Sequence, residues 1–179
     1  MTAPTSLSRR TVLAGLGATV LAGCATVPRS PQAPDGTITL VDAFAGRRTG
    51  RGVFRAPIAG VERGFDVILD GRLEGDVLTV REDFDWDDGE QQTLTWRFTR
   101  TEPGKWIGTR EDVIGTATVE ELGNEIRLQY TADIVSRGET TRLSFADVLY
   151  RAGDGLVRNE AVVRRFGLPI GSVELDIFT

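Results

Sequence analysis

The sequence predicts an all-β domain, an antiparallel up-and-down (lipocalin-like) barrel of about 8–10 strands. From about residue 37 onward, apolar and polar residues alternate, which is the pattern of half-buried strands. Turn residues such as Asp88-Gly89 and Pro103-Gly104 recur every ten or so positions, so short hairpins are expected to join the strands. No stretch shows helical spacing over three turns, which argues against a helical layer.

The expected strands follow one another along the chain, and each is marked by a row of alternating apolar residues. The Gly46–Gly52 segment resembles a dinucleotide-binding loop only in its spacing of glycines, and it is better explained as the flexible entry into a strand. In order, the rows are Phe65, Val67 and Leu69, ending at Asp70-Gly71; Leu78, Val80, Phe84 and Trp86; Leu94, Trp96 and Phe98; Ile126, Leu128, Tyr130, Ala132 and Ile134, ending at Arg137-Gly138; Leu143, Phe145 and Leu149; and Val173, Leu175 and Ile177.

The acidic segment 83–90 falls between two of these rows. Its carboxylates are reminiscent of a calcium loop, but Gly89 comes one place late and Leu94 stands where a closing glutamate is required. Asp-Gly supplies the positive φ angles of a tight hairpin. We therefore expect a hairpin turned by Asp88-Gly89.

Strands joined in this way must avoid exposing two sheet edges. A closed barrel removes both edges, and a β-sandwich would fit the same alternation. The steady succession of short connections favours the up-and-down barrel.

The first residues have the layout of a bacterial export signal. Arg9-Arg10 precede an apolar stretch, 11–22, which is shorter than the roughly 20 residues that span a bilayer. Leu21-Ala22-Gly23-Cys24 follows and resembles a lipobox, so we expect residues 1–23 to be a lipoprotein signal peptide and Cys24 to be the lipidated residue. The context of the arginine pair also resembles a twin-arginine export signal.

The segment after Cys24 is expected to connect a lipid anchor to the domain. Residues 24–36 would form the lipidated N-terminus and a proline-rich, flexible tether, and residues 37–179 the barrel. Ala25, rather than aspartate, follows the cysteine, which by resemblance to bacterial sorting favours the outer membrane, facing the periplasm. The expected location is therefore the bacterial cell envelope, with the membrane as partner through the anchor.

Composition excludes several classes of function. Without residues 1–23 the chain has 156 residues and, having lost Arg9 and Arg10, carries 19 basic and 26 acidic residues, a net charge of −7. Such an acidic domain is a poor ligand for nucleic acid. The chain has no histidine and only one cysteine, which excludes histidine-dependent triads and disulfides and leaves no ordinary zinc ligand set. No cofactor or metal is expected.

Polar residues on otherwise apolar rows are the candidates for a site. Glu82, Asp147 and Asn159 lie on such rows, and Asp112 shares a face with Arg110. One interpretation is an internal network in which an arginine such as Arg110 pairs with an acid, because an unpaired buried carboxylate costs several kcal/mol. The other is a ligand cavity whose polar floor is Glu82, Asp112, Asp147 and Asn159 and whose walls include Trp96, Trp106 and Tyr130.

Several short motifs follow one another in order along nearly the whole domain: 46–54, 80–89, Trp96, 108–117, 145–150, Asn159 and Phe166-Gly167. This ordered set resembles an uncharacterised proteobacterial lipoprotein family, that of domain of unknown function 3833. The resemblance implies a lipocalin-like barrel in the envelope and no established activity. Arg110 stands where the family pattern leads us to expect a small residue, and Val148 where we expect an aromatic one.

Three functions fit these observations. The first is a non-enzymatic envelope lipoprotein that binds a small or lipophilic molecule inside its barrel. The second is a structural or interaction module with a solid core. The third is an envelope hydrolase or isomerase that uses two of the buried carboxylates as acid and base.

Overall fold

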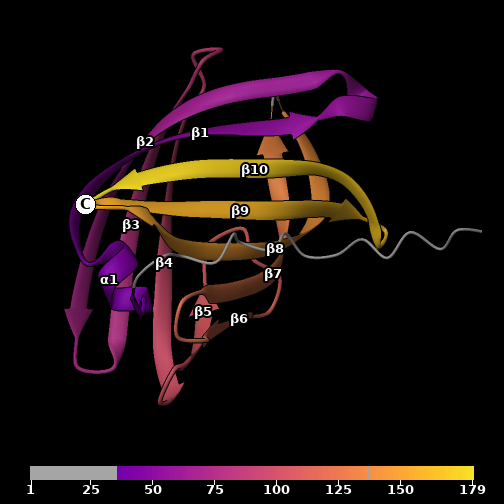
Figure 1. Ribbon diagram of the computed structural model, residues 1–179. Helices are drawn as coiled ribbons and strands as arrows, with labels where there is room; N and C mark the ends of the chain where they lie inside the picture. The colour runs from indigo at the N-terminus through magenta and orange to yellow at the C-terminus, as the bar shows by residue number, and fades with distance from the viewer. Residues whose placement is uncertain (1–35, 137) are drawn as a thin grey trace, which may run out of the picture.

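The computed structural model describes residues 36–136 and 138–179, and these form a closed, antiparallel barrel of ten strands. Each strand pairs with its neighbours in the chain, and β1 pairs with β10 to close the ring (Figure 1). The predicted all-β, up-and-down barrel is therefore confirmed, and the sandwich alternative is wrong. Within the described residues, no helix is long and apolar enough to cross a membrane.

The strands run up and down the barrel wall, and all but one of the nine links between successive strands are short. The longest link, between β5 and β6, spans residues 110–116. The elements are α1 (Leu40–Phe44), β1 (Gly46–Ala56), the 3-10 turn η1 (Pro57–Ala59), β2 (Val61–Glu74), β3 (Val77–Trp86), β4 (Gln91–Glu102), β5 (Lys105–Thr109), β6 (Ala117–Glu121), β7 (Ile126–Ser136), β8 (Glu139–Gly153), β9 (Leu156–Arg165) and β10 (Leu168–Phe178).

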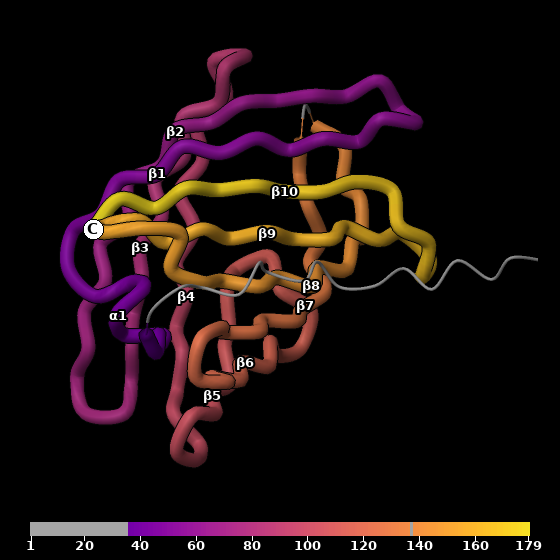
Figure 2. The backbone as a smooth tube through the Cα atoms, viewed as in Figure 1, coloured from indigo at the N-terminus to yellow at the C-terminus, as the bar shows by residue number. Residues whose placement is uncertain are grey.

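The short helix α1 closes one end of the barrel. Thr39 caps it, since the Thr39 hydroxyl accepts from the Asp42 N–H while the Asp42 carboxylate accepts from the Thr39 N–H. Leu40 and Phe44 are buried against the ends of the strands. A side chain at Gly71 would collide with the Phe44 carbonyl, so the glycine lets the end of the helix approach β2 closely. Figure 2 shows α1 at the same end of the barrel as the C-terminal end of the chain.

The inward-facing side chains are fully buried near α1 and partly exposed toward the other end of the barrel. On β3, the inward-facing Leu78 and Val80 are fully buried, whereas Phe84 and Trp86 are only partly buried. The same change occurs along β10, from buried Ile177 to the partly exposed positions before it. We call the first half the closed half and the second the open half. Partly exposed, inward-facing residues of the open half are Phe84, Trp86, Tyr130, Phe145, Asn159, Val173 and Leu175.

Two local predictions differ from the structure. Asp70-Gly71 does not end a strand, because β2 continues to Glu74 and turns at Gly75. The segment 46–52 is part of β1 itself, where the inward-facing Gly50 and Gly52 make room for Val67, Phe65 and Leu175. The hairpin at Asp88-Gly89 is as predicted. The predictions for residues 1–35, including the signal peptide and Cys24, and the Arg137 part of the predicted Arg137-Gly138 turn lie outside the described residues.

Candidate functional site

A cluster of polar side chains lies inside the barrel, between the closed and the open half. Glu82 on β3 and Asp147 on β8 point inward and are only 7% and 5% exposed. Asn159 on β9 lies diagonally across from Asp147. Arg110 and Asp112 come from the link after β5 rather than from the strand on which they were expected. We call these five residues the polar cluster.

Arg110 is the centre of the polar cluster. Its Nε and Nη2 donate to the two Asp112 carboxylate oxygens at 2.7 and 3.0 Å, and its Nη1 donates to Glu82 Oε2 at 3.2 Å. The Arg110 and Glu82 side chains are 8% and 10% exposed, so water screens this ion pair very little. The predicted pairing of Arg110 with an internal acid is thus present, at a position where the family resemblance suggested a small residue.

Aromatic rings surround the guanidinium. Arg110 Cζ lies 4.6 Å from the Trp96 ring centroid and 5.3 Å from that of Tyr130, distances at which a cation is attracted to a ring face. Tyr130 in turn stacks on Phe145, with centroids 4.7 Å apart. Trp96 and Tyr130 therefore lie beside the polar cluster, and Phe145 extends the aromatic wall into the open half.

Asp147 and Asn159 form the second part of the polar cluster. Asn159 Nδ2 donates to Asp147 Oδ1 at 2.9 Å. Asp147 Oδ2 and Asn159 Oδ1 are buried and receive no hydrogen bond in the structure. A buried oxygen without a donor costs free energy, so this pair needs either a proton on the acid or a donor from another molecule.

Burial changes the acidity of both inward carboxyls. Removal from water raises the pKa of Glu82 from 4.5 to about 7, although Arg110 opposes the shift. Burial likewise raises the pKa of Asp147 from 3.8 to about 7, against the hydrogen bond from Asn159 and the charge of Arg110. Burial, and then the charge of Asp147, also raise the pKa of Tyr130, so its phenol stays protonated. Near neutral pH the two acids can therefore gain or lose a proton.

The polar cluster has more potential negative than positive charge. It contains the carboxyls of Glu82, Asp112 and Asp147 against one guanidinium. Its chemistry suits a ligand that brings hydrogen-bond donors or a positive charge to the free oxygens. Within residues 36–136 and 138–179, no group of three or more acidic, histidine or cysteine side chains is arranged to hold a metal ion.

Trp106, which was expected to line the same cavity, lies apart from the polar cluster. Its side chain is 1% exposed, packs in the closed half and donates through Nε1 to Glu121 Oε1 at 3.0 Å. The same oxygen accepts from the Leu40 N–H at 2.8 Å. Trp106 therefore helps to fix α1 to the barrel instead of lining a cavity.

Arg63 is a residue that the sequence analysis missed. It points inward from β2 at the open end and lies over Trp86, with Cζ 4.3 Å from the ring centroid. Its guanidinium binds Asp88 and Glu90 of the β3–β4 hairpin and donates to Ser136 Oγ of β7 at 3.0 Å. Because β2 and β7 are not neighbours in the sheet, this side chain bridges part of the open end. Its position two residues before Phe65, on the same face, is the signal that could have identified it.

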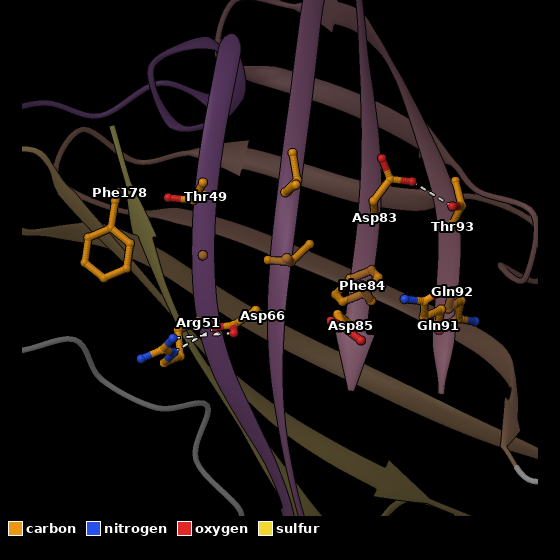
Figure 3. Close-up of a pocket in the computed structure, with 13 residues that line it drawn as sticks. Thr49, Arg51, Asp66, Asp83, Phe84, Asp85, Gln91, Gln92, Thr93 and Phe178 are labelled. Atoms are coloured by element: carbon orange, nitrogen blue, oxygen red, sulfur yellow. Dashed lines mark hydrogen bonds and ion pairs between the residues drawn. The ribbon is translucent and has the colours of Figure 1, made fainter. Parts of the chain in front are cut away.

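A separate pocket of about 790 Å³ lies against the outer face of β1–β4 (Figure 3). Most of its lining consists of outward-facing polar residues, of which Arg51 pairs with Asp66 at 2.7 Å. Asp83 accepts from Thr93 and pairs with Arg81. These charges are exposed and satisfy one another, which is typical of a solvated surface. The lining residues are Thr49, Gly50, Arg51, Asp66, Val67, Ile68, Asp83, Phe84, Asp85, Gln91, Gln92, Thr93 and Phe178.

The fold and the polar cluster define an up-and-down β-barrel with a polar, partly open interior. Comparison with known families gives a match, which covers most of the chain. Residues 18–178 match the family described as "Protein of unknown function (DUF3833)", and the chain belongs to this family. No curated protein sequence matches the chain.

Proposed function

We propose that the protein is a lipid-anchored protein of the bacterial cell envelope that binds a small lipophilic molecule inside the open half of its barrel. The observation that carries the proposal is the pair of oxygens without donors, Asp147 Oδ2 and Asn159 Oδ1, beside a partly exposed aromatic wall. An apolar cavity with a few convergent polar groups is the usual form of a small-molecule site. Barrels with about this number of strands can hold one small ligand.

The polar cluster also indicates which part of the ligand it would hold. A head group with at least two donor hydrogens, such as an amine or a pair of hydroxyls, would satisfy both Asp147 Oδ2 and Asn159 Oδ1. The ligand's apolar body would lie against the half-buried rings of Tyr130, Phe145 and Phe84. A carboxylate head group is disfavoured, because the polar cluster already contains the carboxyls of Glu82, Asp112 and Asp147.

The envelope location is supported by the beginning of the sequence. The twin arginines, the short apolar stretch and Leu21-Ala22-Gly23-Cys24 together are typical of a lipoprotein signal. Attachment would use the Cys24 sulfur, and Ala25 favours the outer membrane. Radiolabelled fatty acid supplied to the host should label the wild-type chain and not a Cys24→Ser variant; labelling of both would contradict attachment at this residue.

The ligand proposal is tested by native mass spectrometry of the mature chain, extracted from its host in mild detergent. We expect a mass excess that is released when the chain is denatured. Asp147→Asn should reduce the bound fraction at least tenfold, because the amide removes one acceptor and the negative charge. Asp133→Asn is the matched control: the partly exposed Asp133 lies on the outer face of β7 and pairs with the exposed Arg142, so this variant should retain the ligand.

Two results would contradict the ligand proposal. A wild-type chain without any mass excess, or an Asp147→Asn variant with the ligand occupancy of the wild type, would contradict binding at the polar cluster. Circular dichroism of both variants shows whether a loss of ligand is only a loss of fold.

A second candidate, a structural module with a filled interior, is favoured by the contacts of Arg110. Its three hydrogen bonds to Glu82 and Asp112 are complete within the protein, as a purely stabilising network requires. In that case Asp147 carries a proton, no small molecule is extracted with the chain, and Asp147→Asn leaves every property except pH dependence unchanged. The same mass measurement therefore separates the two candidates.

A further inference from the structure

Two neighbouring hairpins at the open end expose large apolar side chains. Ile58, in the turn between β1 and β2, is 91% exposed. Phe166 and Leu168, in and after the turn between β9 and β10, are 92% and 69% exposed. These three values exceed those of all other large apolar residues that the structure describes as exposed. We call the three residues the apolar tips.

The apolar tips form one surface because their hairpins lie side by side. β1 and β10 pair along the barrel up to Arg55 and Ser172, and η1 contacts β10 just beyond this pair. Figure 1 shows both hairpins reaching away from α1 in the same direction. The tips are convex and protruding, unlike the groove into which another protein would place an anchor residue.

The backbone conformation at position 166 disfavours a bulky residue, so the turn itself does not explain why a phenylalanine is present. Phe166 has φ 52° and Gly167 has φ 79°, so both central residues of the hairpin loop are left-handed. Loops of this kind favour Asn-Gly or Asp-Gly, because a bulky side chain is strained at positive φ. Phe166 is strained in this conformation, and its side chain buries almost no apolar surface within the barrel. Strain that does not stabilise the fold indicates that the side chain contacts another surface.

Two arginines stand beside the apolar tips. Arg164 and Arg165 adjoin the tips, and Arg165 Cζ lies 5.2 Å from the Phe166 ring centroid. Arginine beside an aromatic ring is a common combination at the boundary between lipid and water. A positive charge at this place attracts an anionic lipid surface.

The segment between Cys24 and the barrel is long enough to let the apolar tips touch a membrane in which Cys24 is anchored. Thr37 lies beside β8, where its carbonyl accepts from Arg151 Nε at 3.2 Å. From Arg151 to Ser144, which pairs with Arg164 close to the apolar tips, β8 advances by roughly 23 Å. Residues 25–35 can span at most about 38 Å when fully extended. A chain attached at Cys24 can therefore reach a membrane that touches the apolar tips.

We propose that the β1–β2 and β9–β10 hairpins are a second membrane contact, which inserts Ile58, Phe166 and Leu168 into the lipid interface and turns the open end of the barrel toward the bilayer. This inference rests on the proposed lipid anchor for its membrane. A lipid surface fits the tips better than a protein partner does, since it accepts protruding apolar side chains without a complementary shape.

Fluorescence quenching tests the contact in the acylated mature chain, reconstituted into vesicles of phosphatidylethanolamine and phosphatidylglycerol. Phe166→Trp places a reporter at the tips, and Leu122→Trp places one at the α1 end, where Leu122 is 46% exposed. After subtraction of the wild-type signal, brominated phospholipids should quench the tryptophan at position 166 at least threefold more than the one at position 122. Equal quenching at both positions, or none at either, would overturn the proposal.

The anchor and the hairpin contact can fail separately. The mass of the mature chain shows whether Cys24 is acylated. If it is not, the same vesicles are sedimented with the unacylated chain and with an Ile58→Ser/Phe166→Ser variant. A bound fraction at least fivefold larger for the wild type supports the hairpin contact, and equal fractions contradict it, whatever the fate of the anchor.

Discussion

Asp147 and Glu82 keep their protons to higher pH in the folded barrel than they would in the unfolded chain. Burial raises both pKa values to about 7. Between about pH 4 and pH 7 the unfolded chain therefore releases protons that the folded chain retains. Raising the pH through this range favours the unfolded state, and the penalty is complete above pH 7.

We predict that the free energy of unfolding of the mature chain falls between pH 5 and pH 8, by roughly 3 kcal/mol for each of the two carboxyls. Because an amide does not ionise, Glu82→Gln and Asp147→Asn should each make the decrease in the free energy of unfolding smaller, by the contribution of the carboxyl that is replaced. Urea denaturation at the two pH values measures the effect.

Asp133→Asn is again the control. The hydrogen bond and charge of Arg142 lower the pKa of Asp133, so this group stays ionised throughout the range. Its replacement should leave the difference between pH 5 and pH 8 as it is in the wild type. If Asp147→Asn kept the full pH dependence of the wild type, Asp147 would not be an acid whose pKa is raised by burial.

At the level of single residues, alternation predicted which side chains point inward but not how deep they lie. Glu82, Asp147 and Asn159 were identified because each interrupts an apolar row. Trp106 was expected on the same face as Arg110 and Asp112, yet it lies near α1, because depth depends on how far each strand is shifted against the next. Arg63 was missed since an arginine at a strand end is ordinarily exposed.

Among the elements, β1 is distinguished by having glycines on its inner face. A Cβ at Gly52 would meet the Phe65 ring, and it would lie 2.7 Å from the Glu174 carbonyl oxygen. The Phe65 ring thus occupies the space that a side chain of β1 would fill.

Gly52→Ala should destabilise the barrel by about 1–3 kcal/mol, because the added methyl group overpacks a filled site. The midpoint of thermal unfolding measures this loss. Gly153→Ala is the matched control, since a Cβ at Gly153, near the end of β8, has nothing within 4 Å. That variant should be neutral or slightly stabilised. Equal midpoints for the two variants would mean that the ring moves aside without cost.

The succession of strands could be predicted, whereas some of their limits could not. Asp70-Gly71 has the composition of a turn, but Gly71 is required in mid-strand by the approach of Phe44. Helix α1 was not predicted, because its five residues form fewer than two turns and show no clear helical spacing of apolar residues. Contacts between distant segments decided both cases, and a local pattern does not contain them.

For the molecule as a whole, the pairing of β1 with β10 is what closes the barrel. β10 pairs with β1 from Arg55–Ser172 to Thr49–Phe178, and with β9 on its other side. Its loss would leave β1 and β9 as open edges next to an unsealed core.

A stop codon at Phe166, which removes β10, should therefore abolish cooperative unfolding. The thermal transition followed by circular dichroism tests this, and removal of Thr179 alone is the control. Thr179 follows the last strand and donates one backbone hydrogen bond to Gly155, so its loss should cost little. A sharp transition in the shorter chain would show that the remaining nine strands close without β10.

The attachment of α1 determines how the molecule would respond to mechanical force. A pull on the chain before Gly36 is carried first by the Thr37 carbonyl, which Arg151 binds, and by the Ile38 N–H, which donates to Gly123. Load then passes to Glu121, whose single oxygen Oε1 holds both Leu40 and Trp106. The helix α1 would therefore detach before any strand separates from its neighbours. A force applied where the chain enters the barrel would open the α1 end and leave the ring of strands intact.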